Sequence, residues 1–397
     1  GILYATTRSE QKPQGLTPDT AFFCNYDSRE KGNMKKVLLG TTAIVAAGLI
    51  ATAPSAQAAE KLQAKVGGYM EQWLGYTSQD AVSGNDFDGL DQKSDGEIHF
   101  KGSTTLDNGV SVGINVQLEA NTGGDMIDES YMIVKGSFGE INIGSENSAQ
   151  YKMHYAPSDY GIGLNSGDQV DWVSTTGVGG TTGTFRGPFG STYTEAGRTN
   201  DANRLTYYTP RIEGFQLGLS YVPNNGEDSN SLVDHNSGTV DGYSVGANYQ
   251  RKFGSVSLGV SGGYGTIDNG SSSGSADPNV YNLGFKMSVG GFSGGISYAA
   301  AEDDASVGDM NGVNIGVAYA SGPWGVSLAY FEGERNGNTS ALAATGKTVH
   351  LSAKYALGPG VTLAGTLGRA EFEDDTAASS GSDNSGTYLV AGLKVSF

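Results

Sequence analysis

Apolar side chains alternate with small or polar ones over many strand-length stretches of the chain after residue 61. Three stretches carry the pattern clearly, with apolar positions at Val110, Val112, Ile114, Val116 and Leu118, at Val349, Leu351, Ala353, Tyr355 and Leu357, and at Leu389, Ala391, Leu393, Val395 and Phe397. A period of two is typical of β-strands whose two faces meet different environments. No comparable run has the spacing of an amphipathic helix, so the sequence predicts an all-β protein.

The predicted strands are joined by short and long connections, which alternate strictly along the chain. Seven connections are tight turns that contain glycine, near residues 107–109, 138–139, 213–214, 253–254, 290–291, 322–323 and 358–360. Eight are longer and polar, near residues 78–94, 121–127, 149–203, 223–241, 268–279, 302–310, 335–347 and 373–386. These fifteen connections predict sixteen antiparallel strands, and they place both termini of the barrel on the short-turn side.

An even number of antiparallel strands can close into a barrel, which leaves no unpaired sheet edge in lipid. Short turns at one end and long loops at the other are typical of outer-membrane barrels, as are aromatic residues near both strand ends. Such aromatics are Phe138, Phe215, Phe253, Phe292 and Trp324 beside the short turns, and Tyr76, Tyr221, Tyr264, Tyr298, Phe331 and Phe372 toward the long loops. A β-sandwich core, the alternative, does not explain their place at strand ends. The predicted fold is therefore a 16-stranded antiparallel transmembrane β-barrel.

The first 58 residues differ in character from the rest of the chain. Residues 34–58 combine a short basic start, an apolar run and a small-residue motif that ends at Ala58. This pattern is typical of a secretory signal peptide, and a single membrane anchor is the alternative. We interpret residues 1–33 as an unstructured upstream extension, or an artefact of the assigned start, and residues 59–397 as the barrel. Because the only cysteine, Cys24, lies in the extension, we expect no disulfide or thiolate site in the barrel.

Charge and glycine content then refine the prediction. Residues 1–58 hold six of the 24 Lys and Arg residues and four of the 42 Asp and Glu residues, so 18 and 38 remain, a net charge of −20. Such an acidic body repels nucleic acid and favours cations. The 62 glycines are about twice the usual share. We expect them in turns and loops, and within strands where small residues ease the bending of the sheet.

Two segments resemble those of a known family. The last strand, residues 386–397, ends in Phe397 with apolar residues at alternate positions, and it resembles the signature by which barrel-assembly machinery recognises Gram-negative porins. Residues 204–216, which lead to Tyr221-Val222-Pro223, are similar to the central hairpin of alphaproteobacterial general porins. The resemblance covers about residues 60–397. Where enteric porins carry Pro-Glu-Phe-Gly-Gly in an inserted loop, the nearest text here is Gly187-Pro188-Phe189-Gly190, so their constriction residues are not transferred.

The resemblance implies a homotrimer in the outer membrane of a Gram-negative bacterium, with the third long loop folded into each barrel. The implied function is passive diffusion of ions and small hydrophilic solutes through a water-filled channel, with no enzymatic activity and no cofactor. From the net charge we expect a mild preference for cations. A solute-specific channel for sugar, phosphate or amino acids remains the alternative, because only the lining of the constriction distinguishes the two.

The loops and the strand parity suggest which charges line the constriction. The third long connection, placed at residues 149–203, is far longer than an ordinary unstructured loop. Its acidic residues could face basic residues on the lumen side of the strands, and opposed charges would screen solutes by charge and size. The candidates are Asp159, Asp168, Asp171 and Glu195 in the loop, and Lys61, Lys65, His99, Lys101 and Lys354 on the wall. A solvated loop or lumen charge is the alternative for each.

Acidic clusters in other long loops form a second group of candidates. They are Asp86, Asp88 and Asp91, then Glu302, Asp303 and Asp304, and finally Glu373, Asp374 and Asp375. Carboxylates suit Ca²⁺ or Mg²⁺, which could bridge these loops to the phosphates of lipopolysaccharide. No EF-hand spacing is present, so simple solvation of the carboxylates remains the stronger interpretation.

Two other classes of protein are less consistent with the sequence. Gly-x-Ser-x-Gly, the motif of a hydrolase nucleophile, occurs at 109–113, 242–246, 259–263 and 291–295. Its serines lie at strand starts or within strands rather than at the strand-to-helix turn that a nucleophile needs. A barrel hydrolase could use His154 with Ser148, Ser158 and Asp159, which share one loop. A surface adhesin built on a β-solenoid should show a fixed internal repeat, and we find none.

Overall fold

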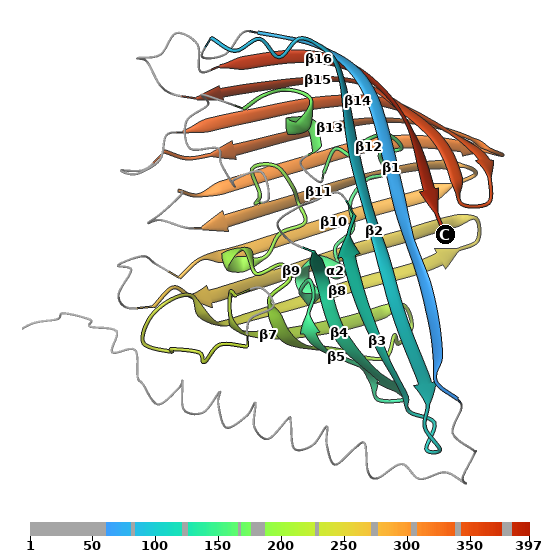
Figure 1. The fold of residues 1–397 in the computed structure, drawn as a ribbon, viewed down its shortest axis with the longest axis vertical. Helices are drawn as coiled ribbons and strands as arrows, with labels where there is room; N and C mark the ends of the chain where they lie inside the picture. The colour runs from blue at the N-terminus through green and yellow to red at the C-terminus, as the bar shows by residue number, and fades with distance from the viewer. Residues whose placement is uncertain are drawn as a thin grey trace, which may run out of the picture. The chain divides into compact units, whose positions relative to one another are not determined.

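The computed structural model describes residues 61–80, 84–120, 126–165, 168–175, 187–226, 230–270, 277–302, 308–337, 343–374 and 383–397. The predicted signal peptide and upstream extension lie outside these residues. Within them, sixteen β-strands form one closed antiparallel barrel, in which β1 pairs with β16 (Figure 1). The predicted all-β fold and its strand number are confirmed.

The strands follow one another around the barrel in chain order. They are β1 (Gln63–Gln79), β2 (Gly89–Thr105), β3 (Ser111–Glu119), β4 (Ile127–Gly136), β5 (Gly139–Ser145), β6 (Asn203–Tyr208), β7 (Phe215–Asn224), β8 (Val240–Phe253), β9 (Val256–Asp268), β10 (Asn279–Val289), β11 (Phe292–Glu302), β12 (Met310–Ser321), β13 (Trp324–Arg335), β14 (Ala344–Gly358), β15 (Val361–Asp374) and β16 (Asn384–Ser396).

The short turns gather at one end of the barrel, which we call the short-turn end, and the long connections gather at the other, the long-loop end. Each short turn contains a glycine with positive φ, for example Gly254 at 59° and Gly360 at 72°. Other residues rarely adopt this conformation, and it lets the chain reverse within a few residues. The turn positions predicted from glycine are therefore confirmed. No helix of the described residues is long and apolar enough to cross a membrane.

The two faces of the wall differ as the alternation predicts. On β14, Val349 and Leu351 are 42 and 53 per cent exposed on the outer face, while His350 and Ser352 are almost fully buried inside. In a membrane the apolar outer face meets lipid. Because the barrel is closed, each strand has a neighbour on both sides with which its backbone N–H and C=O groups form hydrogen bonds. Phe331 and Phe372 were predicted among the aromatics at the membrane interface, and this prediction is wrong. Both side chains point into the lumen and are 1 per cent exposed. How close a residue lies to the end of a strand does not tell which face it is on, whereas its odd or even place in the alternation does.

The connection between β5 and β6, residues 146–202, is called loop 3 here. It contains α2 (Ala149–Lys152), η1 (Asp168–Asp171) and η3 (Ala196–Arg198). The largest buried apolar cluster joins Ile162, Trp172 and Phe189 of loop 3 to wall residues such as Trp73 and Tyr388. The apolar core therefore lies between loop 3 and the wall. The green ribbon of loop 3 runs inside the barrel (Figure 1). The predicted insertion of the third long loop is confirmed.

Candidate functional site in the barrel lumen

Lumen-facing glycines give loop 3 the room to lie against the wall. A β-carbon at Gly284 of β10 would lie 1.9 Å from the carbonyl oxygen of Tyr155, and one at Gly333 of β13 would lie 1.8 Å from that of Phe189. Real β-carbons do not approach heavy atoms closer than 3.0 Å. Similar close approaches occur at Gly75, Gly218, Gly246, Gly312, Gly316 and Gly386. Many strand glycines thus make space for loop 3, a role beyond the bending predicted from sequence.

Lumen-facing hydroxyl groups accept hydrogen bonds from the backbone of loop 3. The donor and acceptor pairs are Ala149 N with Ser220 Oγ at 2.9 Å, Tyr155 N with Ser261 Oγ at 2.8 Å, Tyr160 N with Ser327 Oγ at 3.0 Å and Ile162 N with Thr366 Oγ1 at 3.2 Å. These acceptors come from β7, β9, β13 and β15, so they fix the loop at points spread around the wall. Each bond contributes about 1 kcal/mol and avoids a buried unpaired N–H group.

One of the four Gly-x-Ser-x-Gly motifs lies where loop 3 contacts the wall. In residues 259–263 of β9, Ser261 accepts the Tyr155 bond, and Gly259 lies under the Tyr155 ring. A β-carbon at Gly263 would come within 2.7 Å of Gln150 of the loop. The motif therefore receives loop 3 and does not form a nucleophile turn.

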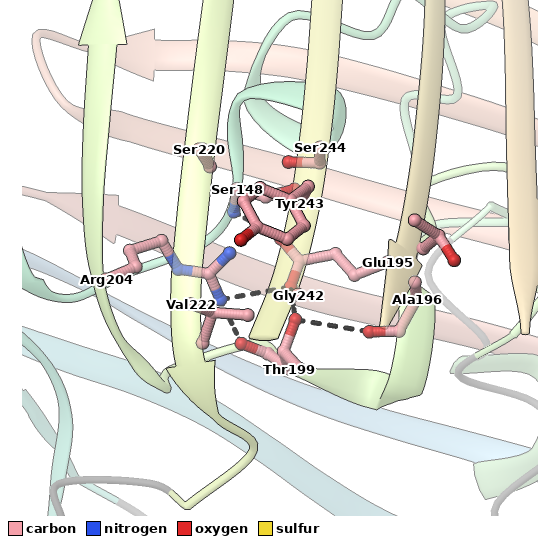
Figure 2. Close-up of a pocket in the computed structure, with 11 residues that line it drawn as sticks. Ser148, Glu195, Ala196, Thr199, Arg204, Ser220, Val222, Gly242, Tyr243 and Ser244 are labelled. Carbon is pink, nitrogen blue, oxygen red and sulfur yellow. Dashed lines mark hydrogen bonds and ion pairs between the residues drawn. The ribbon is translucent and has the colours of Figure 1, made fainter. Parts of the chain in front are cut away.

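A buried ion pair fixes the end of loop 3 to β6. Arg204 Nη2 donates to Glu195 Oε2 at 3.2 Å and also to the carbonyl oxygen of Thr199, as Figure 2 shows. Glu195 additionally accepts from the backbone N–H of Ser148 and from the Thr199 hydroxyl. The two charged side chains are 1 and 4 per cent exposed. The space among these residues is about 10 Å³, which is too small for a solute, so this pocket is structural.

A second buried group fixes the middle of loop 3 to β14 and β16. Asp159 Oδ2 lies 2.8 Å from His350 Nδ1, and His350 Nε2 lies 2.6 Å from the Tyr388 hydroxyl. Asp159 also accepts a bond from Ser327. The His350 and Asp159 side chains are 0 and 8 per cent exposed. The network is therefore largely shielded from the lumen, and it holds loop 3 against the wall.

The open part of the lumen lies between loop 3 and the wall formed by β1, β2 and β16. It contains a cavity of about 570 Å³. Its polar and charged lining is Tyr69, Glu71, Asp95, His99, Lys101, Asp168, Lys394 and Ser396. We call this cavity the passage. A polar space of this size, with charges of both signs, accommodates water and small hydrophilic solutes.

Most charges of the passage have a partner on the same wall. Lys394 lies 3.1 Å from Glu71, and the Tyr69 hydroxyl donates to Asp95 at 3.2 Å and to the neighbouring Glu97 at 2.8 Å. These bonds hold the side chains against the wall and keep the passage open.

The predicted constriction residues divide into two sets. The first set lies in or near the open lumen. Asp168, His99 and Lys101 line the passage. Asp171 interacts with the charges of Lys93 and Asp95, and the remaining lysines lie near the short-turn end, at Lys61, Lys65 and Lys354. The structure does not place Asp159 and Glu195 on the lining. Both are in loop 3, as expected, but both carboxylates are buried: Glu195 pairs with Arg204, and Asp159 is hydrogen-bonded to His350.

The predicted metal clusters are only partly within the described residues, because Asp303, Asp304 and Asp375 lie outside them. Asp91 pairs with Lys93 at 2.6 Å, and Asp88 accepts from the backbone N–H of Gln79 at 2.6 Å. Asp86 Oδ1 accepts from the backbone N–H of Asp88 at 3.0 Å. Among the described residues, the predicted carboxylates nevertheless form no converging group of three. Among described residues, the carboxylates that do converge are Glu97, Glu119 and Asp128, within 4.8 Å of one another. The sequence did not indicate this group, because it spans three strands.

The residues proposed for a hydrolase are not assembled. His154 Nε2 lies 3.0 Å from Thr192 Oγ1, and burial lowers the pKa of this histidine to about 4. Ser148 Oγ caps α2 by accepting from the Tyr151 backbone N–H, and Asp159 is paired with His350. His154, Ser148 and Asp159 therefore each have a structural partner, and no contact joins Ser158 to them among the described residues.

Sequence reasoning missed several lining residues. Glu71, Asp95 and Lys394 share the lumen parity of His99 and Lys101, so the alternation contained the signal for them. Their convergence with Asp168 depends on the path of loop 3, which the alternation does not determine.

Comparison with known proteins supports the same architecture. A family model described as Gram-negative porin matches residues 40–375. An uncharacterised protein of Rickettsia felis is 25 per cent identical over 299 residues, covering 58 per cent of this chain and 67 per cent of the relative. The fold is similar to the anion-selective porin from Comamonas acidovorans, with a TM-score of 0.58 and 16 per cent identity over 85 per cent of this chain and all of the other. The trimer form of OmpT from Vibrio cholerae has a TM-score of 0.54 and 14 per cent identity, with coverage of 85 and 100 per cent.

Proposed function

The chain belongs to the Gram-negative porin family and lies in the outer membrane, and from this premise we propose that the passage is the sieve of a channel for passive diffusion of ions and small hydrophilic solutes. The observation that carries this proposal is the polar cavity of about 570 Å³ between loop 3 and the wall. The described part of loop 3 packs buried side chains against the wall, so solutes would pass beside it.

Swelling of liposomes that contain the purified protein tests the proposal. Small sugars should enter and swell the vesicles, and the rate should fall steeply as the sugar grows. Equal rates for all sugars would overturn the proposed sieve. Saturable block of the ionic current by one sugar or amino acid would instead indicate a solute-specific channel.

We further propose a mild preference for cations. The net charge of −20 over residues 59–397 supports it, as do the three carboxylates of the passage, Glu71, Asp95 and Asp168, beside two lysines and one histidine. Carboxylates at a narrow point raise the local concentration of cations. The test is the zero-current potential across a bilayer in a salt gradient, and a clear anion preference would overturn the proposal.

We propose that the protein assembles as a homotrimer, in line with the trimer form of one structural neighbour. Its other proposed partners are lipopolysaccharide, bridged by Ca²⁺ or Mg²⁺ at acidic long-loop residues such as Asp86 and Asp88, and the barrel-assembly machinery, which would recognise Phe397. The Phe397 side chain is 66 per cent exposed on the outer face at the barrel seam. Melting of the trimer in lipopolysaccharide, with and without a chelator, tests the divalent bridge, and an unchanged melting temperature would overturn it.

A further inference from the structure

Polar residues form two adjacent rows across the lumen face of β8 to β11, near the short-turn end. In the first row each residue stands opposite the next one in the strand register, and its members are Lys252, Ser257, Ser288 and Ser293. The second row lies closer to loop 3 and consists of Gln250, Gly259 and Lys286. On β9 these positions share the parity of Ser261, which accepts a bond from loop 3. The two rows carry two ammonium groups, three hydroxyl groups and one amide.

One cavity of about 440 Å³ lies over both rows. Every residue of the two rows lines this cavity, and loop 3 contributes Ala156, Pro157 and Ser158 to the lining. None of the described residues that line it is acidic. A space of this volume accommodates a small solute, and both lysines therefore border the same solute-sized space.

The Lys286 side chain extends from β10 across β9 toward β8. Gly259 on β9 leaves room for it, because a β-carbon there would lie 3.0 Å from Lys286 Cγ and 3.1 Å from Lys286 Cε. The Lys286 ammonium is 4.0 Å from the centre of the Tyr155 ring, and the Tyr155 hydroxyl donates to Gln250 Oε1 on β8 at 3.2 Å. Lys252 stands two residues beyond Gln250 on the same face of β8. The path of the side chain thus brings the Lys286 ammonium toward Lys252.

The protein itself leaves the polar groups of this cavity unused. Within the described residues, neither lysine has a carboxylate at ion-pair distance, and the side-chain hydroxyls of the three serines form no hydrogen bond. Other lumen serines differ, since Ser261 and Ser327 accept bonds from the loop 3 backbone. The contact with Tyr155 orients the Lys286 ammonium without neutralising it. Ammonium and hydroxyl groups are both hydrogen-bond donors, so the cavity offers a ligand several donors and a net positive charge.

We propose that Lys252 and Lys286, with the hydroxyls of Ser257 and Ser288 between them, form a binding site for small solutes that carry a phosphate group. Inorganic phosphate is the simplest of these ligands. The ammonium groups balance its charge, and the hydroxyls donate to its oxygen atoms. This inference rests on the proposed channel function, and it adds a binding step on the short-turn side of loop 3 to a channel whose passage favours cations.

The phosphorus NMR line width of inorganic phosphate, titrated into the purified protein in detergent, tests this site without any measurement of current. The wild-type protein should broaden the resonance in a saturable manner. In Lys252→Gln/Lys286→Gln the half-saturating concentration should rise roughly fivefold or more at low ionic strength, because two unit charges beside the ligand are lost. Ser257→Ala/Ser288→Ala keeps both charges and should raise it by roughly fivefold, because hydrogen bonds to the ligand are lost.

The matched control is Lys354→Gln, which removes a lysine at the same end of the barrel. Lys354 lies 3.7 Å from the Tyr160 ring of loop 3, but it is on β14 and outside the cavity, so phosphate binding should be unchanged. Gel migration with and without heating establishes that each variant is folded. An unchanged half-saturating concentration in K252Q/K286Q or in S257A/S288A would overturn the site, as would an equal rise in K354Q. Absence of phosphate binding by a protein that conducts would refute this inference alone, whereas absence of conductance would refute the channel function.

Discussion

Removal of the Arg204 charge should release the end of loop 3 from the wall. In Arg204→Met the Glu195 carboxylate stays buried, with only the Ser148 backbone N–H and the Thr199 hydroxyl as donors. Breaking a buried pair on one side costs about 3–5 kcal/mol, because an uncompensated charge remains. At about 1.4 kcal/mol for each factor of ten, the ratio of anchored to released loop should fall about 10²- to 10⁴-fold.

The released loop would enter and leave the passage, so single-channel recordings of Arg204→Met should show closures and excess current noise that the wild type lacks. Glu195→Gln/Arg204→Met leaves no buried charge and should be quieter than Arg204→Met. This order separates the electrostatic cost from lost packing at position 204. A quiet, wild-type current in Arg204→Met would refute the anchoring role, and equal noise in both variants would refute its electrostatic origin.

Three further predictions follow from individual residues. Gly284→Ala should displace loop 3, because the added carbon would lie 1.9 Å from the Tyr155 carbonyl oxygen. We expect the substitution to destabilise the folded protein by about 1–3 kcal/mol and to alter the single-channel conductance. Gly294→Ala, whose nearest contact would be 3.7 Å, should conduct like wild type. Burial, with the Asp128 charge, raises the pKa of Asp201 to about 8, so the folded loop holds a proton that the unfolded chain loses near pH 4. The stability of the loop end should therefore fall, and the current noise should rise, between about pH 4 and about pH 8. Asp201→Asn should remove this pH dependence of the current noise. Phe397→Ala should lower the yield of folded trimers without changing the conductance of those that form, and an unchanged yield would contradict a role in assembly.

The barrel could be predicted from sequence because its determinants are local. Alternation such as that of Val349 and Leu351 reports which face meets lipid, and a glycine such as Gly254 reports where the chain reverses. Both signals lie within a few residues and repeat around the wall. Strand number and the two ends of the barrel follow from them without knowledge of any long-range contact.

The lumen could be predicted only in part, because its contacts join residues far apart in the chain. Parity indicates that His350 and Ser261 face inward, but not that His350 binds Asp159 or that Ser261 receives Tyr155. Loop 3 also buries some of its own charges in these contacts, so acidity in the loop does not mark the lining. The burial of Glu195 beside Arg204 is one result of this.

The most direct test of the channel is whether current flows through the passage between loop 3 and the wall. Lys101→Cys places a thiol on the lining, in a chain whose Cys24 is replaced by serine. A bulky hydrophilic maleimide should reduce the single-channel current of Lys101→Cys, in three steps for a trimer, and should leave the current of Leu351→Cys, on the outer face, unchanged. Complete labelling of Lys101→Cys, established by mass spectrometry, with no loss of current would contradict the proposed route.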